Sequence, residues 1–465
     1  MPKINIKMKK IIAIICVIIA FSCANPQEKI SETAILIANA NVVDVRTGNI
    51  LEQRQVVIDS GKIQHISEVV ENAEGYKITI DGQGKYLMPG LAEMHAHIPQ
   101  PSTRNPEIVD ETLFLYLSNG ITTIRGMLGG PSHLELREKA KNNEILSPRI
   151  YTSSPSLNGN SIRTEEEAIA KVTQYQKDGY DFLKIHPGIQ LDVFNAAVKT
   201  AKEVGIPYAG HVPVDVGVRH AMESGYASID HVDGFLEGLV PQSANVNPSA
   251  NGFFGYAFTP LADVNYIDEL VGMAKKHKVW IVSTQSLYER WFAPVSADEL
   301  LKQPEMKYMA KSTLENWKVR KAQYTDAEDF SVEQWEKFNE IRRQLMKKLQ
   351  DGGHGMLLGS DAPQLFNVPG FSIHHEIDGM LRAGLTPLEI IKSGTINPAI
   401  YFDEEGNFGE VKENQSADLI LLNANPLEDV KALKSISGVM VKGQWLSKEY
   451  IDARLSEIAE RNANK

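Results

Sequence analysis

The sequence predicts an α/β protein in which a TIM (β/α)8 barrel carries a small β-sandwich domain built from both chain termini. Between residues 87 and 402, short apolar segments alternate with amphipathic helical segments, as in parallel βα units. Residues 34–86 and 403–449 instead contain short strand patterns separated by turns. With 43% hydrophobic and 23% charged residues over 465 positions, the composition is that of a soluble globular protein.

The first 23 residues resemble a bacterial lipoprotein signal peptide. Four lysines among the first ten residues precede an apolar run over residues 11–21, which is shorter than the roughly 20 residues of a membrane-spanning helix. The small residues near Cys23 predict lipidation of that cysteine, and plain secretion is the alternative. Residues 24–33 would form a polar tether. We therefore expect an exported lipoprotein, anchored in a membrane and facing the periplasm or the cell surface.

Both flanks of the barrel region contain strand patterns. Gly61 lies in a predicted hairpin turn of the N-terminal flank, because glycine accepts positive φ angles. Residues 450–465 predict a C-terminal tail helix. The strands expected in the two flanks cover residues 35–37, 41–43, 55–58, 417–422, 439–441 and 444–446.

Eight strand patterns alternate with helices in the central region. Thr164 with Glu167 forms a capping box at the start of one of these helices, and Thr386-Pro387 opens another with a cap and an N1 proline. Long connections at about residues 233–278 and 286–352 interrupt the alternation, and insertions at this end of a barrel often form substrate lids. The expected strands cover residues 86–94, 121–125, 149–153, 182–185, 208–211, 228–231, 279–284 and 356–360.

Side chains of the types that bind metals lie at the ends of several expected strands. His95 and His97 end the first strand, and residues i and i+2 of a strand point to the same side. His211, His231 and Asp361 end the fifth, sixth and eighth strands. The catalytic groups of a TIM barrel lie at this end of the strands. Imidazole and carboxylate groups suit zinc, with manganese, iron or cobalt as alternatives.

Lys184 lies within an apolar strand, where an ammonium group is costly to bury. Burial lowers the pKa of a lysine, and a neutral amine can react with carbon dioxide to form a carbamate. Such a carbamate is an anionic ligand with two oxygens, able to bridge two metal ions. The alternative is an ion pair between Lys184 and a buried acid such as Asp181 or Asp361.

These motifs together resemble the amidohydrolase superfamily, in particular its imidazolonepropionase and Xaa-Pro dipeptidase-like branch. The resemblance covers nearly all of residues 34–447. It rests on Met88-Pro89-Gly90-Leu91, His95-Ala96-His97, Lys184, His211, His231, Ser360-Asp361, Ala417-Asp418-Leu419-Ile420-Leu421 and Val441-Lys442-Gly443.

The resemblance implies a binuclear metal site and a role for each ligand. One divalent ion would be held by His95, His97 and Asp361, and a second by two further histidines. Carbamylated Lys184 and a hydroxide would bridge the two ions, so that carbon dioxide or bicarbonate is needed. Asp361 would also act as the general base. The second pair of histidines consists of His211 and His231.

Further residues are weaker candidates for substrate binding. Arg125 follows the second strand and could clamp a carboxylate or form a structural ion pair. Tyr151 could line the pocket from the third strand. His186 shares a strand face with Lys184 and could contact substrate, or it could be a loop histidine bonded to backbone. The pair His374-His375 is expected to be structural, because adjacent side chains point apart.

The predicted function is hydrolysis of a C–N amide bond, in a dipeptide or an N-acyl amino acid, by a metal-bridging hydroxide. Hydrolysis of a cyclic amide, a lactone or a phosphotriester is the alternative, and a non-catalytic surface-binding lipoprotein is a less favoured one. The expected partners are a small-molecule substrate and, through the lipid on Cys23, a membrane. A homo-oligomer is compatible with the fold. The net charge of −11 argues against a nucleic-acid partner.

Overall fold

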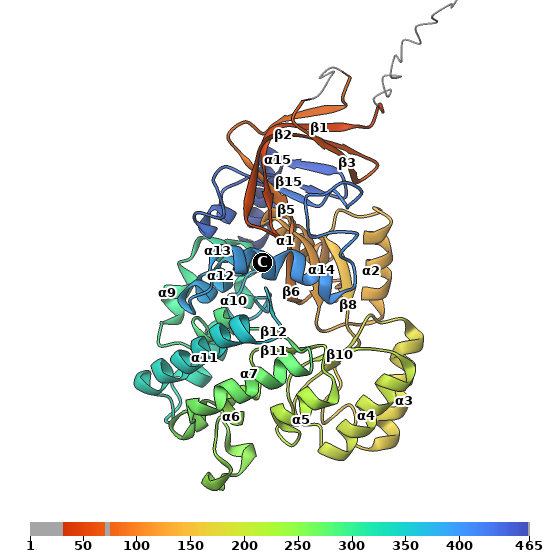
Figure 1. Cartoon of the computed structure of the whole chain (residues 1–465). Helices are drawn as coiled ribbons and strands as arrows, with labels where there is room; N and C mark the ends of the chain where they lie inside the picture. Colours follow the sequence, from red (N-terminus) through yellow and green to blue (C-terminus); the bar gives the residue numbers. More distant parts are fainter. Residues whose placement is uncertain (1–30, 70–74, 464–465) are drawn as a thin grey trace, which may run out of the picture.

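A computed structural model describes residues 31–69 and 75–463 of the chain. The predicted signal peptide, most of the tether and Cys23 lie outside the described residues. A sheet built from both termini forms one end of the molecule, and the α/β body forms the rest (Figure 1). Within the described ranges, no helix has the length and apolarity needed to cross a membrane.

The terminal sheet joins the two ends of the chain. Its eight strands have the order β16-β15-β14-β5-β1-β2-β3, and β4 pairs with β1. Because β14 pairs with β5 of the N-terminal part, the two flanks share one sheet, as their strand patterns predict. Two facing sheets, as in a β-sandwich, are not confirmed. The strands are β1 (Ile35–Asp44), β2 (Asn49–Asp59), β3 (Lys62–Ser67), β4 (Ile78–Asp81), β5 (Tyr86–Pro89), β14 (Leu419–Leu422), β15 (Ile436–Val441) and β16 (Gln444–Ser447).

The segment predicted as the first barrel strand forms two strands in two different sheets. Residues Tyr86–Pro89 belong to the terminal sheet as β5, and Leu91–Ala96 form β6 of the barrel region. Gly90 separates them and passes so close to Thr122 that an added Cβ would lie 2.0 Å from its Oγ1. The predicted domain boundary at residue 87 therefore falls inside β5 of the terminal sheet, and the barrel strands begin only at Leu91.

Eight parallel strands follow one another in sequence order and give a TIM-barrel-like fold. They form a sheet of three strands and a sheet of five, which do not join into one closed sheet. Isolated parallel bridges link the two sheets at Ser153–Phe182 and extend β6 at Ala96–Ala362. The strands are β6 (Leu91–Ala96), β7 (Ile121–Gly126), β8 (Arg149–Thr152), β9 (Leu183–Ile185), β10 (Tyr208–Gly210), β11 (Ser228–Asp230), β12 (Trp280–Val282) and β13 (Met356–Leu357).

Helices surround these strands, and several begin at the caps that the sequence predicts. Thr164 accepts a hydrogen bond from the backbone N–H of Glu167 at the start of α3, and Thr386 with Glu389 forms a full capping box. The helices are α1 (Ile108–Ser118), α2 (Pro131–Lys141), α3 (Glu165–Asp178), α4 (Leu191–Val204), α5 (Gly217–Ser224), α6 (Phe235–Gly238), α7 (Ile267–Lys276), α8 (Gln285–Tyr288), α9 (Ala297–Leu301), α10 (Lys311–Thr325), α11 (Val332–Gly352), α12 (Ser372–Arg382), α13 (Pro387–Gly394), α14 (Ile396–Tyr401) and α15 (Lys448–Ala463).

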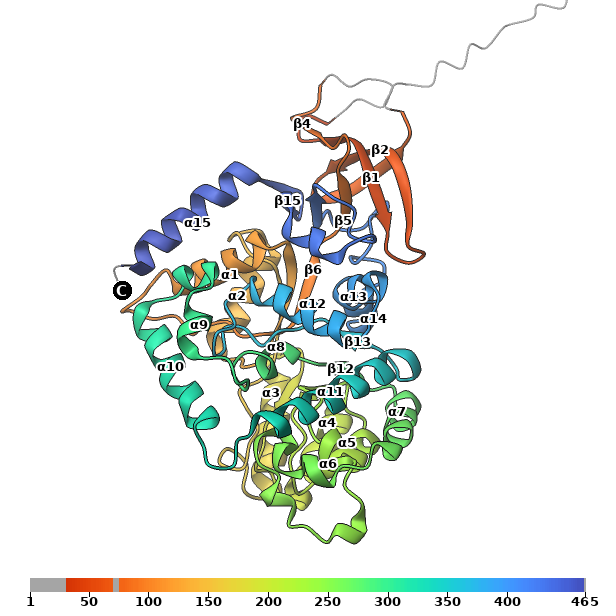
Figure 2. The ribbon, with the colours of Figure 1, turned by 90° about the vertical axis from the view of Figure 1, so that its left-hand side faces the viewer.

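The long connections after β11 and β12 are folded segments. The first contains α6, α7 and four 3-10 helices, and the second contains α8 to α11 and one more. The tail helix α15 runs back from the terminal sheet (Figure 2). It lies against α1 and against the 3-10 helix η5 (Pro304–Tyr308). The 3-10 helices are η1 (Gln242–Ala244), η2 (Pro248–Ala250), η3 (Phe253–Leu261), η4 (Val264–Tyr266), η5 (Pro304–Tyr308) and η6 (Val430–Lys434).

Lys321 of α10 holds the second connection together from within. Its side chain is buried, and its Nζ donates hydrogen bonds of 2.7–2.8 Å to the carbonyl oxygens of Arg290, Trp291 and Ala293. We expect Lys321→Met to lower the free energy of unfolding by about 2–3 kcal/mol, because three buried carbonyls lose a charged donor. Urea unfolding measures this change. Lys318→Met on the same helix removes a half-exposed ion pair, so an equal loss in both variants would contradict the role of Lys321.

Candidate metal centre

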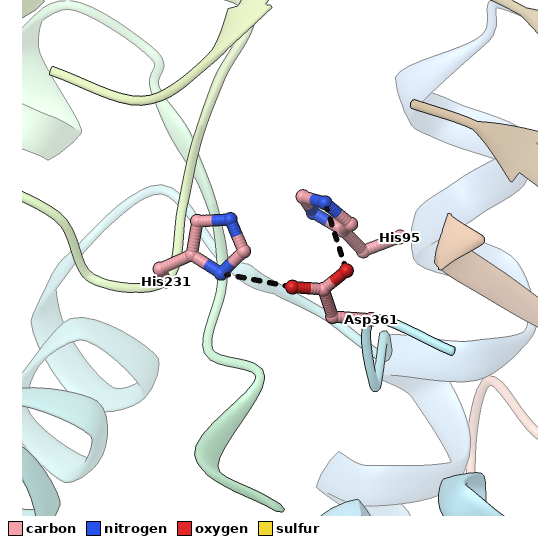
Figure 3. A group of neighbouring side chains, drawn as sticks. All are labelled: His95, His231 and Asp361. Carbon is pink, nitrogen blue, oxygen red and sulfur yellow. Dashed lines mark ion pairs between the residues drawn. The ribbon is translucent and has the colours of Figure 1, made fainter. Parts of the chain in front are cut away.

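Three of the predicted ligands meet where β6, β11 and β13 end. Possible ligand atoms of His95, His231 and Asp361 lie within 4.8 Å of one another, and all three side chains are buried. Asp361 presents one oxygen to each histidine, with Oδ1 3.6 Å from His95 Nε2 and Oδ2 3.9 Å from His231 Nδ1 (Figure 3). This spacing leaves room for an ion between the groups.

The other three predicted ligands surround this group. His97 Nε2 lies 2.6 Å from Asp361 Oδ1, and Lys184 Nζ lies 3.5 Å from His95 Nε2. The ring centroids of His211 and His231 are 4.5 Å apart. The tertiary structure therefore brings together all six residues that the strand-end positions predict.

Two of these residues have an unusual backbone conformation. His231 has φ of 66° and Asp361 has φ of 63°, in the left-handed region that is costly for residues with a Cβ. His231 directly follows β11, and Asp361 lies in the segment that follows β13. Surrounding contacts must offset a cost of about 1–3 kcal/mol for each residue, and such strain is concentrated at functional sites.

Polar partners orient the histidine rings. His211 Nδ1 lies 3.0 Å from Asp233 Oδ2, and His95 Nδ1 lies 3.1 Å from Asp230 Oδ2. In both rings this leaves Nε2 free to face a metal ion, as in carboxylate–histidine–metal arrangements. Sequence reasoning missed both acids. They flank His231 in the sequence, and this clustering of acids beside a candidate ligand was the available signal.

The protonation states suit metal binding. Burial lowers the pKa of His211 to about 3 and holds those of His95 and His231 well below the usual value. These imidazoles are therefore neutral at pH 7, the form that binds metals. Burial also lowers the pKa of Lys184 to about 8, against the opposing charges of Asp230 and Asp361. Neutral imidazoles with a carboxylate are a donor set that fits a divalent cation such as zinc.

The ion-pair alternative for Lys184 is wrong about Asp181, whereas the charge of Asp361 does act on the amine. Asp181 instead accepts a hydrogen bond of 2.7 Å from the backbone N–H of Thr152 and pairs with Arg137. The ion pair of Lys184 is with Asp230, whose Oδ2 lies 4.0 Å from Nζ. This distance is too long for a hydrogen bond, so the amine is buried without a close carboxylate.

Glu93 is a third buried acid that sequence reasoning missed, after Asp230 and Asp233. Its carboxylate accepts hydrogen bonds of 2.7 and 2.6 Å from the backbone N–H and the hydroxyl of Ser360, and one of 3.1 Å from the N–H of His95. Burial raises the pKa of Glu93 to about 8. Glu93 thus ties β6 to the segment that carries Asp361 and fixes two ligands relative to each other.

The prediction that Arg125 could clamp a substrate carboxylate is wrong. Its guanidinium is fully buried and donates to Asp230, Ser228 and Tyr401 at 2.7–2.9 Å, and to the carbonyl oxygen of Met94. These partners use its donors, so the structural ion pair is the correct alternative. Burial raises the pKa of Asp230, but Arg125 and Lys184 outweigh this and keep the pKa below its usual value.

Tyr151 does not line the cavity at the metal centre either. Its ring stacks on Phe402, with centroids 3.6 Å apart. His186 does line the cavity, where its Nδ1 lies 2.6 Å from Ser156 Oγ and its ring lies 4.8 Å from that of His211. Burial lowers the pKa of His186 to about 2, so the ring is neutral and faces the candidate ligands.

His374 and His375 are structural, as the sequence predicts. The first contacts Asn119 at 3.1 Å and the second contacts Glu305 at 2.7 Å. Neither lies at the metal centre, because adjacent residues of α12 point in different directions.

A cavity of about 590 Å³ opens above the candidate ligands. Its size is within the range of small-molecule sites. Residues from both long connections, such as Phe254 and Trp291, form part of its wall. The predicted role of these connections in covering the site is consistent with this position.

A barrel-like fold with metal-binding side chains near its strand ends is an arrangement that metal-dependent hydrolases use. A model of the Amidohydrolase family matches residues 86–446, and the chain belongs to this family. The family assignment supports a hydrolase that acts on C–N bonds.

Similar proteins in this family differ in their substrates. An adenine deaminase from Clostridium perfringens is 25% identical over 202 residues, or 40% of this chain and 34% of that enzyme. The chain thus matches about a third of this curated relative. A bottromycin amidohydrolase structure has a TM-score of 0.68 at 20% identity, and the match covers 92% of this chain and 90% of the bottromycin amidohydrolase chain. A Xaa-Pro dipeptidase with bound methionine has a TM-score of 0.63 at 19% identity, covering 89% and 100%.

Proposed function

We propose that this protein is a metal-dependent amidohydrolase that cleaves the C–N amide bond of a dipeptide or an N-acyl amino acid. The observation that carries the proposal is the convergence of six candidate ligands beside one cavity. We propose further that the protein is exported and anchored to a membrane through a lipid on Cys23. The lipid would hold the enzyme at a surface where small peptides or acylated amino acids pass.

Each candidate ligand has a role in this proposal. When bound, two divalent cations, with zinc favoured by the donor set, supply Lewis-acid activation of water and of the substrate carbonyl group. His95, His97 and Asp361 would hold one of them, and His211 and His231 the other. The rings would offer their lone pairs to the ions, and Asp233 and Asp230 would keep those of His211 and His95 aimed at the site.

Asp361 is the residue proposed to move the proton. Its carboxylate lines the cavity and is 4% exposed, so it can reach a substrate while being shielded from bulk water. It accepts a proton from the attacking water and transfers it to the leaving nitrogen. The water oxygen becomes part of the new carboxylate, and the nitrogen leaves as an amine.

Amine release from a library of dipeptides and N-acyl amino acids tests the proposal. The soluble form from Ala24 onward, loaded with zinc and bicarbonate, is expected to hydrolyse part of the library. Turnover of lactones, cyclic amides or phosphotriesters without any turnover of linear amides would favour the alternative reaction. A protein that binds these compounds but hydrolyses none would favour the non-catalytic scaffold.

Carbamylation of Lys184 is expected to depend on pH. Because the pKa of Lys184 is about 8, its neutral and reactive fraction increases as the pH rises through that value. Metal-free protein with ¹³C-labelled carbon dioxide at constant dissolved concentration should show a stronger carbamate NMR signal at about pH 9 than at about pH 6.5. Lys184→Met should remove this signal. A signal that persists in this variant would assign the carbamate to another lysine.

A further inference from the structure

A strained aromatic segment at the start of η3 forms one wall of the cavity. Phe254 has φ of 51° and ψ of 43°, a left-handed conformation that is rare for an aromatic residue. Its ring lies 5.7 Å from that of His211 and 5.4 Å from that of His231. Gly252 and Gly255, with φ of 68° and 81°, flank the pair Phe253-Phe254. The chain therefore turns sharply here and brings Phe254 against the candidate ligands.

Neighbouring aromatic residues hold this segment in place. The Phe253 ring lies 4.6 Å from that of Phe292 and 4.9 Å from that of Trp291. Phe254 itself packs edge-on against Tyr288, with centroids 5.4 Å apart. Aromatic pairs at these distances each contribute about 0.5–1.5 kcal/mol, enough together to offset the backbone strain at Phe254. Phe254 is only half-buried, so part of its ring remains exposed in the cavity.

The described lining of the same cavity has no lysine or arginine that could pair with a substrate carboxylate. Arg125 is fully occupied beneath the site. Trp291 lines the cavity and is 9% exposed, and its Nε1 is buried with no hydrogen-bond partner in the described part of the chain.

We propose that Phe254 and Trp291 form a specificity pocket for an uncharged aromatic group next to the scissile bond. The inference rests on the proposed amide hydrolysis and narrows its substrate class to amides with an aromatic side chain and a neutral terminus. Phe254 stacks on the aromatic group, and the Trp291 ring forms part of the same cavity wall. A free carboxylate at that end gains no ion pair with a lysine or arginine of the cavity wall.

Binding to a variant without turnover tests the pocket separately from catalysis. Calorimetric titration of Asp361→Asn protein with Ala-Phe-NH2, Ala-Ala-NH2 and Ala-Phe provides the comparison. We expect Ala-Phe-NH2 to bind about 10-fold or more tightly than Ala-Ala-NH2, and at least as tightly as Ala-Phe. Equal binding of the two amides, or tighter binding of the free acid, would overturn the inference.

Matched substitutions test whether Phe254 causes the preference for the aromatic amide. In the same background, Phe254→Leu should reduce the preference for the aromatic amide about 3- to 10-fold. Phe330→Leu is the control, because Phe330 packs on Tyr256 and Phe292 but does not line the cavity. An aromatic preference that survives Phe254→Leu unchanged would also overturn the inference. If the active protein hydrolyses linear amides without a preference for the aromatic amide, only the pocket assignment fails. If the Asp361→Asn protein binds Ala-Phe-NH2 selectively but the active protein hydrolyses no amide, only the proposed reaction fails.

Discussion

The Asp361→Asn substitution is expected to reduce amide hydrolysis on the order of 10³–10⁴-fold, with the fold retained. Asp361 is placed to act both as a metal ligand and as the proton carrier, and asparagine of the same size can do neither as well. Its carboxylate lies 2.6 Å from His97 Nε2 and 3.6 Å from His95 Nε2, so the substitution also removes the group that links these two rings.

Steady-state kinetics together with metal analysis measures this effect. Circular dichroism establishes that the variant folds. Asp378→Asn is a matched control on α12, where the carboxylate makes a partly exposed contact of 3.7 Å with Lys434. The control should retain nearly full activity. Comparable activity of the Asp361→Asn and Asp378→Asn variants would rule out a catalytic role for Asp361.

Replacing Lys184 with alanine should lower both metal content and activity. A carbamate at this position would be an anionic ligand to the metals, and its loss should cost at least about 10²-fold, the upper range for groups that act only through a ligand. Among the described residues, the ion-pair partner of Lys184 is Asp230, which is 4.0 Å away and is held by Arg125. A purely structural role for the lysine would leave the metal content unchanged.

Chemical rescue distinguishes these roles. Acetate or propionate should restore part of the metal binding and activity of Lys184→Ala, because a small carboxylate can occupy the space of the missing carbamate. Lys442→Ala is the control, since Lys442 is another partly buried lysine with a pKa lowered to about 8 by burial, and it does not line the metal-centre cavity. A Lys184→Ala protein with normal metal content and no response to carboxylates would exclude a carbamate ligand.

The strand-end histidines illustrate what a local pattern can predict. An apolar run followed by a polar metal-binding residue marks the end of a buried strand, and parallel strands present these ends at one edge. That rule predicted, without knowledge of the packing, that His95, His211, His231 and Asp361 lie at one site. Helix caps such as Thr386 with Glu389 were equally predictable, because their hydrogen bonds lie within four residues.

The family, the order of the barrel strands and the set of candidate ligands could thus be predicted from the sequence, because they depend on short-range patterns. The role of Arg125, the division of the first strand at Gly90 and the supporting acids Glu93 and Asp230 became visible in the folded structure. These depend on contacts between residues far apart in the chain: Arg125 meets Asp230, and Glu93 meets Ser360. A buried charge without a partner is too costly, so a buried charged side chain must pair with another group. Which group that is depends on contacts between distant residues, and these contacts decide whether the side chain remains available to a substrate.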